Sequence, residues 1–123
     1  MKVTSRVNYG KLQQINKAAI ESLKLTGEDV RSNLIHSQTM PFDTGDMQNQ
    51  QTFVENKEAN SGKVSIITDA PQARRLYYHP EYNFQKHGNQ NAGGLWFEPY
   101  INGNKKDYAK KVFTRHLRSR IWD

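Results

Sequence analysis

The chain contains no cysteine, only four prolines and no long apolar run. Without thiols it holds neither a disulfide nor thiolate-bound zinc, and it has no cysteine nucleophile. No stretch of about 18 apolar residues occurs, so no transmembrane helix is predicted. The N-terminal residues MKVTSRVNYG lack the apolar core of a secretory signal. We therefore expect a protein of a reducing compartment that makes no membrane contact.

The 123 residues predict a single domain over residues 1–123, long enough to bury a core without metal or disulfides. The net charge of +6 is unevenly distributed. Residues 104–123 hold seven Lys and Arg against two Asp, so this segment carries +5 of the +6. Such a segment suits DNA, an acidic protein surface or plain solvent. The candidate nucleic-acid contacts within it are Lys105, Lys106, Lys110, Lys111 and Arg115.

Hydrophobic periodicity predicts a long N-terminal helix, because apolar residues recur in steps of three and four from Tyr9 to Leu34. Gly27 interrupts the pattern, and a glycine in a helix interior costs about 1 kcal/mol relative to alanine. Two alternatives therefore stand. We favour one continuous helix to His36, and the other is a pair of helices separated at Gly27. Pro41 ends the helical region in either case.

Two strands are predicted over residues 47–55 and 63–68. The polar loop between them ends in Asn-Ser-Gly, so they are expected to pair antiparallel. A short helix should follow the second strand, with Asp69 as its N-cap, Pro71 in its first turn and Pro80 at its end.

The C-terminal third predicts a loop, an apolar segment and a helix. Residues 85–94 are rich in Gly, Asn and Gln, and we expect a mobile surface loop there. Residues 95–101 resemble a strand that Pro99 limits. Asn104 is the expected N-cap of a final helix with one apolar stripe and one basic face. The fold class that follows is α+β: an N-terminal helix or helix pair, a small antiparallel sheet with a short inserted helix, and a C-terminal helix packed on the sheet.

Motifs for catalysis are weak. Asp43-Thr44-Gly45 resembles the aspartic-protease motif, but that chemistry needs two carboxylates and hence a dimer of this chain, and Pro41 precedes the motif where an apolar strand belongs. The four histidines show no helical metal-binding spacing, and the serines have no base at a recognisable spacing. We therefore predict no catalytic residues, no metal and no cofactor, with a turn as the interpretation of the motif.

Aromatic and arginine side chains cluster after the second predicted strand. Four rings occur between Tyr77 and Phe84, directly after Arg74 and Arg75. Arginine beside tyrosine suits nucleic-acid stacking, but both residue types are also enriched at protein interfaces, which we favour. Ala73, Leu76 and Tyr77 are the expected inward side of the short helix. The candidate interface residues are Arg74, Arg75, Tyr78, His79, Tyr82 and Trp96.

Several blocks carry a family resemblance. MPFDTGDMQN at 40–49, TFVE at 52–55, KVSIITDAPQARRLYYHPEYNF at 63–84 and NAGGLWFEPYINGNKKDYAKKVF at 91–113 resemble the minor capsid protein family of tailed bacteriophages. More broadly, the chain is similar to head–tail connector and tail-completion proteins of phages and prophages. The resemblance covers roughly residues 8–117, and its specific blocks are ARRLYYHPEYNF, GGLWFEPYI and KKDYAKK.

The resemblance implies a non-enzymatic virion protein that joins head and tail at the neck as an oligomeric ring. It implies neighbouring head-closure and tail proteins as partners, contact with genomic DNA in the channel, and a location in the virion or, during assembly, in the host bacterial cytoplasm. A small basic nucleic-acid-binding protein is the alternative function, and a dimeric aspartic hydrolase is a distant third.

Overall fold

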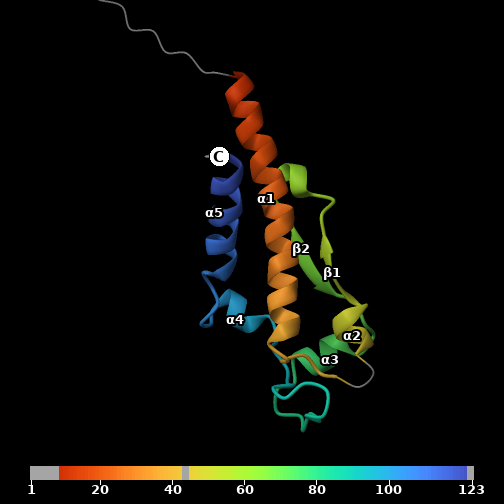
Figure 1. The fold of residues 1–123 in the computed structure, drawn as a ribbon. Coiled ribbons are helices and arrows are strands. Elements are labelled where there is room, and N and C mark those ends of the chain that lie inside the picture. Colours follow the sequence, from red (N-terminus) through yellow and green to blue (C-terminus); the bar gives the residue numbers. More distant parts are fainter. Residues whose placement is uncertain (1–8, 43–44, 122–123) are drawn as a thin grey trace, which may run out of the picture.

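The computed structural model describes residues 9–42 and 45–121, which are organised around one long helix (Figure 1). In chain order the elements are α1 (Tyr9–His36), α2 (Asp46–Asn49), β1 (Thr52–Glu55), the 3₁₀ helix η1 (Ala59–Ser61), β2 (Ser65–Thr68), α3 (Ala73–Tyr77), α4 (Glu98–Ile101) and α5 (Tyr108–Ile121). Helix α5 lies along one side of α1 and the β1–β2 hairpin along the other, with α2 and α3 near the C-terminal end of α1 (Figure 1). The predicted α+β class is confirmed.

Helix α1 is continuous, which confirms the alternative that we favoured. Gly27 is tolerated within it because the hairpin packs against the helix at this point. A Cβ atom placed on Gly27 would lie 2.8 Å from Val64 Cγ1 and 2.9 Å from Val54 Cγ1. The glycine therefore lowers helix propensity but lets two valines approach the helix backbone.

The sheet is a two-stranded antiparallel hairpin in which Phe53 pairs with Ile67. The predicted strand over 47–55 is wrong in its first part, where α2 turns Met47 into the core. Thr52 Oγ1 donates a hydrogen bond to the Met47 carbonyl oxygen at 2.7 Å, which closes this turn before β1 begins. A local side-chain bond thus competes successfully with strand pairing.

The apolar segment 95–101 forms no strand. Leu95 has a φ of 53°, and its N–H donates to the Tyr77 carbonyl oxygen at 3.0 Å instead of pairing with β2. Gly94 permits this approach, because a Cβ there would lie 2.8 Å from the same oxygen. Pro99 then falls in the first turn of α4, where its missing N–H is tolerated.

Neither predicted N-cap acts as one. Helix α3 begins after Gln72, whereas Asp69 extends the hairpin, because its N–H donates to the Gln51 carbonyl oxygen at 2.7 Å. Helix α5 begins directly after Asp107, and Asn104 lies in the preceding turn. In both cases turn residues separate the predicted cap from the helix.

The final helix packs on α1 and not on the sheet, which corrects the predicted packing. The hairpin occupies the opposite side of α1, so α1 lies between the two (Figure 1). The inward stripe of α5 is as predicted, since Val112 is buried and Phe113 and Leu117 are partly buried. Two polar contacts also join the C-terminal half of α5 to α1: His116 Nε2 is hydrogen-bonded to Asp29 Oδ2 at 2.6 Å, and Arg120 Nε forms an ion pair with Glu21 Oε2 at 3.5 Å.

The buried core lies at the C-terminal end of α1 and centres on Trp96, which is only 2% exposed. The rings of Tyr77 and Trp96 meet edge to face, with centroids 4.8 Å apart. Leu34, Met40, Met47 and Ala73 complete the buried cluster. This core joins helices α1, α2 and α3 to the turn before α4.

The loop over 85–94, which we expected to be mobile, is hydrogen-bonded to the segment that follows α1. Asn89 is 3% exposed, and its Nδ2 donates to the Met40 carbonyl oxygen at 2.8 Å and to Gln48 Oε1 at 2.7 Å. The N–H groups of Asn91 and Gly93 donate to backbone carbonyls of residues 38 and 39. Backbone and amide hydrogen bonds thus compensate for the loop's lack of apolar side chains.

Candidate functional site

An apolar groove of about 720 Å³ opens between α1, β2, α3 and α4. Its base is the α1 stripe through Leu23, Gly27 and Val30, which the hairpin and α5 cover from either side only in part. Its walls include Ile66 of β2 and Ile101 of α4. We call this surface the apolar groove. A two-stranded sheet is too narrow to cover α1 completely, which is the structural origin of the groove.

Two predicted interface residues, Arg74 and Tyr78, line the apolar groove from α3. Tyr78 is 65% exposed, and its ring meets that of Tyr77 edge to face with centroids 5.1 Å apart. Ala73 is buried and Leu76 and Tyr77 are partly buried, so the inward side of α3 is as predicted. The outward Arg–Tyr pair thus stands on a helix that the core holds in place.

The predicted residues after α3 form a second, smaller group. The rings of His79 and Tyr82 stack with centroids 4.7 Å apart and an interplanar angle of 6°. His79 Nδ1 also lies 2.7 Å from Glu81 Oε1, and this hydrogen bond lowers the pKa of the Glu81 carboxyl. Arg75 and Tyr82 are exposed. His79, Glu81 and Tyr82 thus form a partly exposed aromatic and charged patch after α3, whereas Arg75 lies within α3 itself.

Trp96 corrects the predicted interface. Its side chain is 2% exposed and packs against Tyr77 and Phe97, so it belongs to the core and only borders the apolar groove from beneath. Ile101, at the end of the same apolar run, was not a candidate, yet it is 59% exposed and lines the apolar groove. Hydrophobicity alone does not separate the two, because both belong to the same apolar run.

Burial around the groove raises two tyrosine pKa values. Burial is the main cause for Tyr77, and the nearby Glu98 carboxylate adds to it. Burial, with a smaller contribution from Tyr108, raises the pKa of Tyr100 to about 12. The Tyr100 hydroxyl donates to Asn33 Oδ1, so both phenols remain neutral in the physiological range and act as packing and hydrogen-bonding groups.

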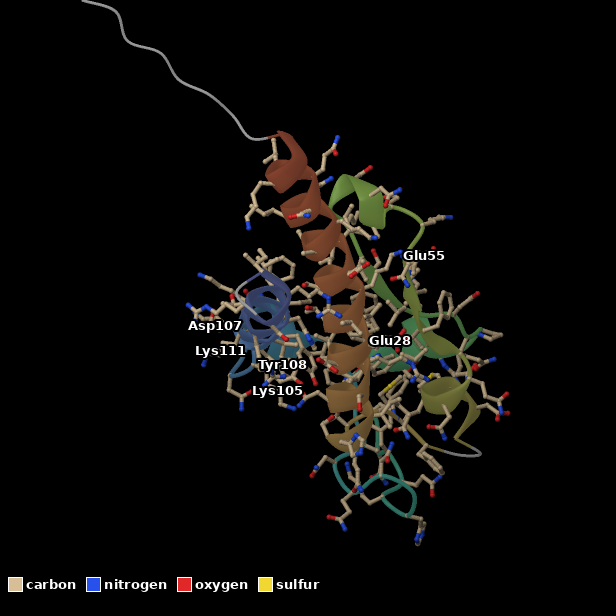
Figure 2. All side chains as sticks on the ribbon, turned by 45° about the horizontal axis from the view of Figure 1, so that its top comes forward. Glu28, Glu55, Lys105, Asp107, Tyr108 and Lys111 are labelled. Atoms are coloured by element: carbon tan, nitrogen blue, oxygen red, sulfur yellow. The ribbon has the colours of Figure 1, made fainter. Side chains whose placement is uncertain are left out.

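The basic face of α5, formed by Lys110, Lys111, Arg115 and Arg118, is exposed. Within residues 9–42 and 45–121, none of these four cations has an ion-pair partner within 4.0 Å. Figure 2 shows Lys111 on the α5 side of the molecule, on the far side of α1 from Glu55 of the hairpin. Of the other candidate contacts, Lys106 is exposed, whereas Lys105 lies over the Tyr100 ring, 5.3 Å from its centroid. Arg118 lies on the same exposed face but was not among the candidate nucleic-acid contacts.

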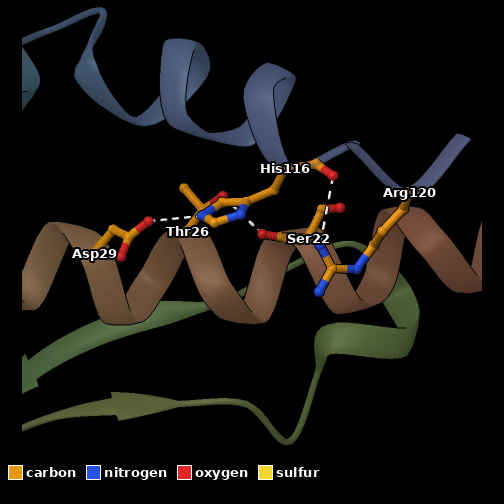
Figure 3. Close-up of polar contacts among 5 residues, drawn as sticks. All are labelled: Ser22, Thr26, Asp29, His116 and Arg120. Atoms are coloured by element: carbon orange, nitrogen blue, oxygen red, sulfur yellow. Dashed lines mark hydrogen bonds and ion pairs between the residues drawn. The ribbon is translucent and has the colours of Figure 1, made fainter. Parts of the chain in front are cut away.

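A serine, a histidine and an aspartate approach one another between α1 and α5 without forming a catalytic triad (Figure 3). His116 Nε2 lies 2.6 Å from Asp29 Oδ2. Ser22, however, is fully buried, and its Oγ has no hydrogen-bond partner among the described residues. Nucleophilic catalysis requires a serine hydroxyl within reach of its base and of a substrate, and Ser22 has neither.

No cluster of three or more His, Cys, Asp or Glu with metal-binding geometry occurs in the part of the chain that the structure describes. Asp43 and Thr44 of the protease-like motif lie outside the described residues. Among the described helices, none is both long and apolar enough to cross a bilayer. Comparison with protein-family models, curated proteins and solved structures finds no match to this chain.

Proposed function

We propose that this protein is a non-enzymatic structural component of a tailed phage or prophage virion, and that it joins head and tail at the neck as part of an oligomeric ring. The observation that carries the proposal is the apolar groove, with exposed Tyr78 and Ile101 on its walls. Exposed apolar surface lined by aromatic and arginine side chains is typical of protein–protein interfaces. The resemblance of the blocks around Arg74 and Tyr78 to minor capsid proteins supplies the biological setting.

A non-catalytic role is supported by the chemistry of the surfaces. The groove is lined mainly by aliphatic and aromatic side chains, with Thr26, Thr68 and Arg74 as its polar lining residues, and Arg74 is its one charged lining residue. The His79 imidazole stacks on the Tyr82 ring and is hydrogen-bonded to Glu81. Its contacts are therefore with an aromatic ring and a carboxylate and not with a nucleophile. These arrangements suit binding better than proton transfer.

Deletion of the coding sequence from the phage or prophage that carries it tests the proposal. We expect DNA-filled heads and separate tails to accumulate, because the joint between them is missing. A plasmid copy should restore tailed particles, and a copy with Arg74→Ala and Tyr78→Ala should restore them poorly although the variant melts near the wild-type temperature. Lys57→Ala, an exposed change on the hairpin loop, is the control and should complement fully. Normal tailed particles from the deletion strain would refute the proposal.

The basic face of α5 supports a second candidate function, the binding of nucleic acid. Four cations without ion-pair partners among the described residues lie on one side of one helix, which suits contact with phosphates along a DNA backbone. The two functions are compatible, because a ring at the neck surrounds the DNA channel. Binding of a random-sequence duplex across a salt series is the test. A steep loss of affinity with salt that becomes shallower in Lys111→Ala with Arg115→Ala supports this function, and the absence of binding at low salt rejects it.

A further inference from the structure

The outer edge of β2 carries backbone groups that the β1–β2 hairpin does not use. The Asp69 N–H donates to the Gln51 carbonyl oxygen at 2.7 Å, and this bond sets the pattern of the ladder. Bonded and non-bonded pairs alternate along antiparallel strands, so the next residue of β2 that bonds to β1 is Ile67, two positions earlier. The N–H and C=O groups of Ile66 and Thr68 therefore point away from β1.

This edge of β2 borders the apolar groove. Of the described hairpin residues, Val64, Ile66 and Thr68 line the groove and those of β1 do not, so the groove lies on the side of β2 that faces away from β1. Among the described residues, no group forms a hydrogen bond with the outward N–H and C=O groups of Ile66 and Thr68. An unpaired strand edge is a template for a further strand.

The opposite edge of the hairpin is partly blocked. Arg31 Nε donates to the outward carbonyl oxygen of Thr52 in β1 at 2.7 Å, and its Nη2 donates to the Asn49 carbonyl oxygen at 3.0 Å. The arginine thus occupies the start of the β1 edge. Strand β2 (Ser65–Thr68) contains no charged residue and no proline, which are the residues that commonly protect an exposed edge. The two edges therefore differ, and only that of β2 is suited to pairing along its whole length.

The surfaces on both sides of this edge suit the two faces of an added strand, whose side chains alternate between them. On the α1 side, such a strand would meet Leu23 and Val30 at the base of the groove. On the outer side, it would lie beside Ile67, which is 36% exposed and pairs with Phe53, itself 37% exposed. Both faces thus offer apolar contacts next to the unpaired backbone groups.

We propose that the apolar groove receives an extended segment of a neighbouring protein, which adds to β2 as a third strand of the sheet. This proposal rests on the role of the groove as a protein interface proposed above. The backbone of Ile66 and Thr68 would bond to the segment, and its side chains on the α1 side would cover the stripe that a two-stranded sheet leaves open. In strand addition the main-chain bonds supply affinity, and pockets for alternate side chains supply specificity. The segment is therefore apolar at every second position.

Selection from a displayed library of random dodecapeptides on the full chain tests the proposal. Peptides that also bind the Ile101→Glu variant are discarded, because this exposed side chain lines the groove and its replacement alters the groove without disturbing the core. We expect the remaining peptides to share apolar residues at alternating positions. Apolar residues in steps of three and four would indicate a helical occupant and overturn the proposal. The absence of any groove-binding peptide would overturn it as well.

Single N-methyl groups along a selected peptide test the backbone contact. Only every second N–H of an added strand faces β2, so methylation should weaken binding about tenfold or more at alternate positions and change it little at the positions between. In hydrogen exchange, the amides of Ile66 and Thr68 should become protected only when the peptide binds, whereas that of Ile67 should be protected throughout. Equal losses at adjacent positions would overturn the proposal, as would edge amides whose protection does not change.

The Ile66→Pro variant removes one outward N–H and no bond of the β1–β2 ladder. Ile66→Ala is the matched control, because it loses the same side chain and keeps the N–H. We expect the selected peptide to bind Ile66→Pro more weakly than Ile66→Ala, and equal binding would contradict the added strand. Circular dichroism establishes that both variants are folded, and the methylated peptides decide the question on the wild type if Ile66→Pro is not. If strand addition is found but the deletion strain still makes tailed particles, the proposed neck function fails while the strand site stands.

Discussion

Replacement of Gly27 by alanine tests whether the close approach of the hairpin determines the packing on α1. In an exposed helix interior this change stabilises by about 1 kcal/mol. Here the new methyl group would lie under 3 Å from methyl groups of Val54 and Val64, which must move. Valine has little χ1 freedom, and overpacking in a filled site typically costs about 1–3 kcal/mol. We therefore expect a net loss of about 1 kcal/mol in the free energy of unfolding, or roughly 4 °C in melting temperature.

Urea denaturation followed by circular dichroism measures this change. Asn16→Ala is a suitable control, because this exposed α1 position should gain a few tenths of a kcal/mol from helix propensity alone. Val64→Ala should also be less harmful in the Gly27→Ala background than in the wild type, because the smaller side chain leaves room for the new methyl group. If Gly27→Ala stabilised the protein by the full amount expected for an exposed glycine, the hairpin would not pack as described.

Three further outcomes are expected. Asn89→Ala should cost roughly 2 kcal/mol in urea denaturation, because two buried acceptors lose their donor, whereas the exposed Asn91→Ala should cost less. In hydrogen exchange of the free protein, the amide of Gly93 should be protected, and exchange at the random-coil rate would contradict the bound loop. The raised pKa of Tyr100, about 12, means that its neutral form stabilises the fold below about pH 10 and that this contribution is lost as the pH rises toward 12. The stability difference between wild type and Tyr100→Phe should therefore shrink over that range, and a constant difference would refute this assignment.

Helices α1 and α5 could be predicted because the apolar periodicity of each extends over several turns. The apolar stripe of α1 continues on both sides of Gly27, and the stripe of α5 recurs through Val112 to Ile121. The hairpin was predictable from two short apolar segments around a turn. Local sequence does not determine which surface a helix covers, so the packing of α5 on α1 could not be distinguished from packing on the sheet.

The errors arose where single hydrogen bonds outweigh local propensity. The bond from Thr52 to Met47 shortens β1, and the bond from Leu95 to Tyr77 diverts an apolar run from the sheet. The loop over 85–94 follows the same principle, since Asn89 donates hydrogen bonds to groups 41 and 49 residues away in the sequence. Hydrogen bonds between residues this far apart cannot be predicted from the local amino-acid composition.

The candidate interface was partly predictable. The four-residue spacing of Arg74 and Tyr78 placed both on the outer side of α3, where the structure has them. Trp96 was wrongly included, because an aromatic residue in an apolar run gives no sign of whether it faces the core or a partner. The groove itself depends on how far the hairpin covers α1, which only the packed structure reveals.

Cryo-electron microscopy of virus-like particles purified from a strain whose genome encodes this chain tests its proposed role most directly. We expect a ring of copies at the junction of head and tail, with the α1–α5 pair and the hairpin recognisable in each copy. Particles whose heads and tails are joined without this chain, or copies located only elsewhere in the particle, would contradict it.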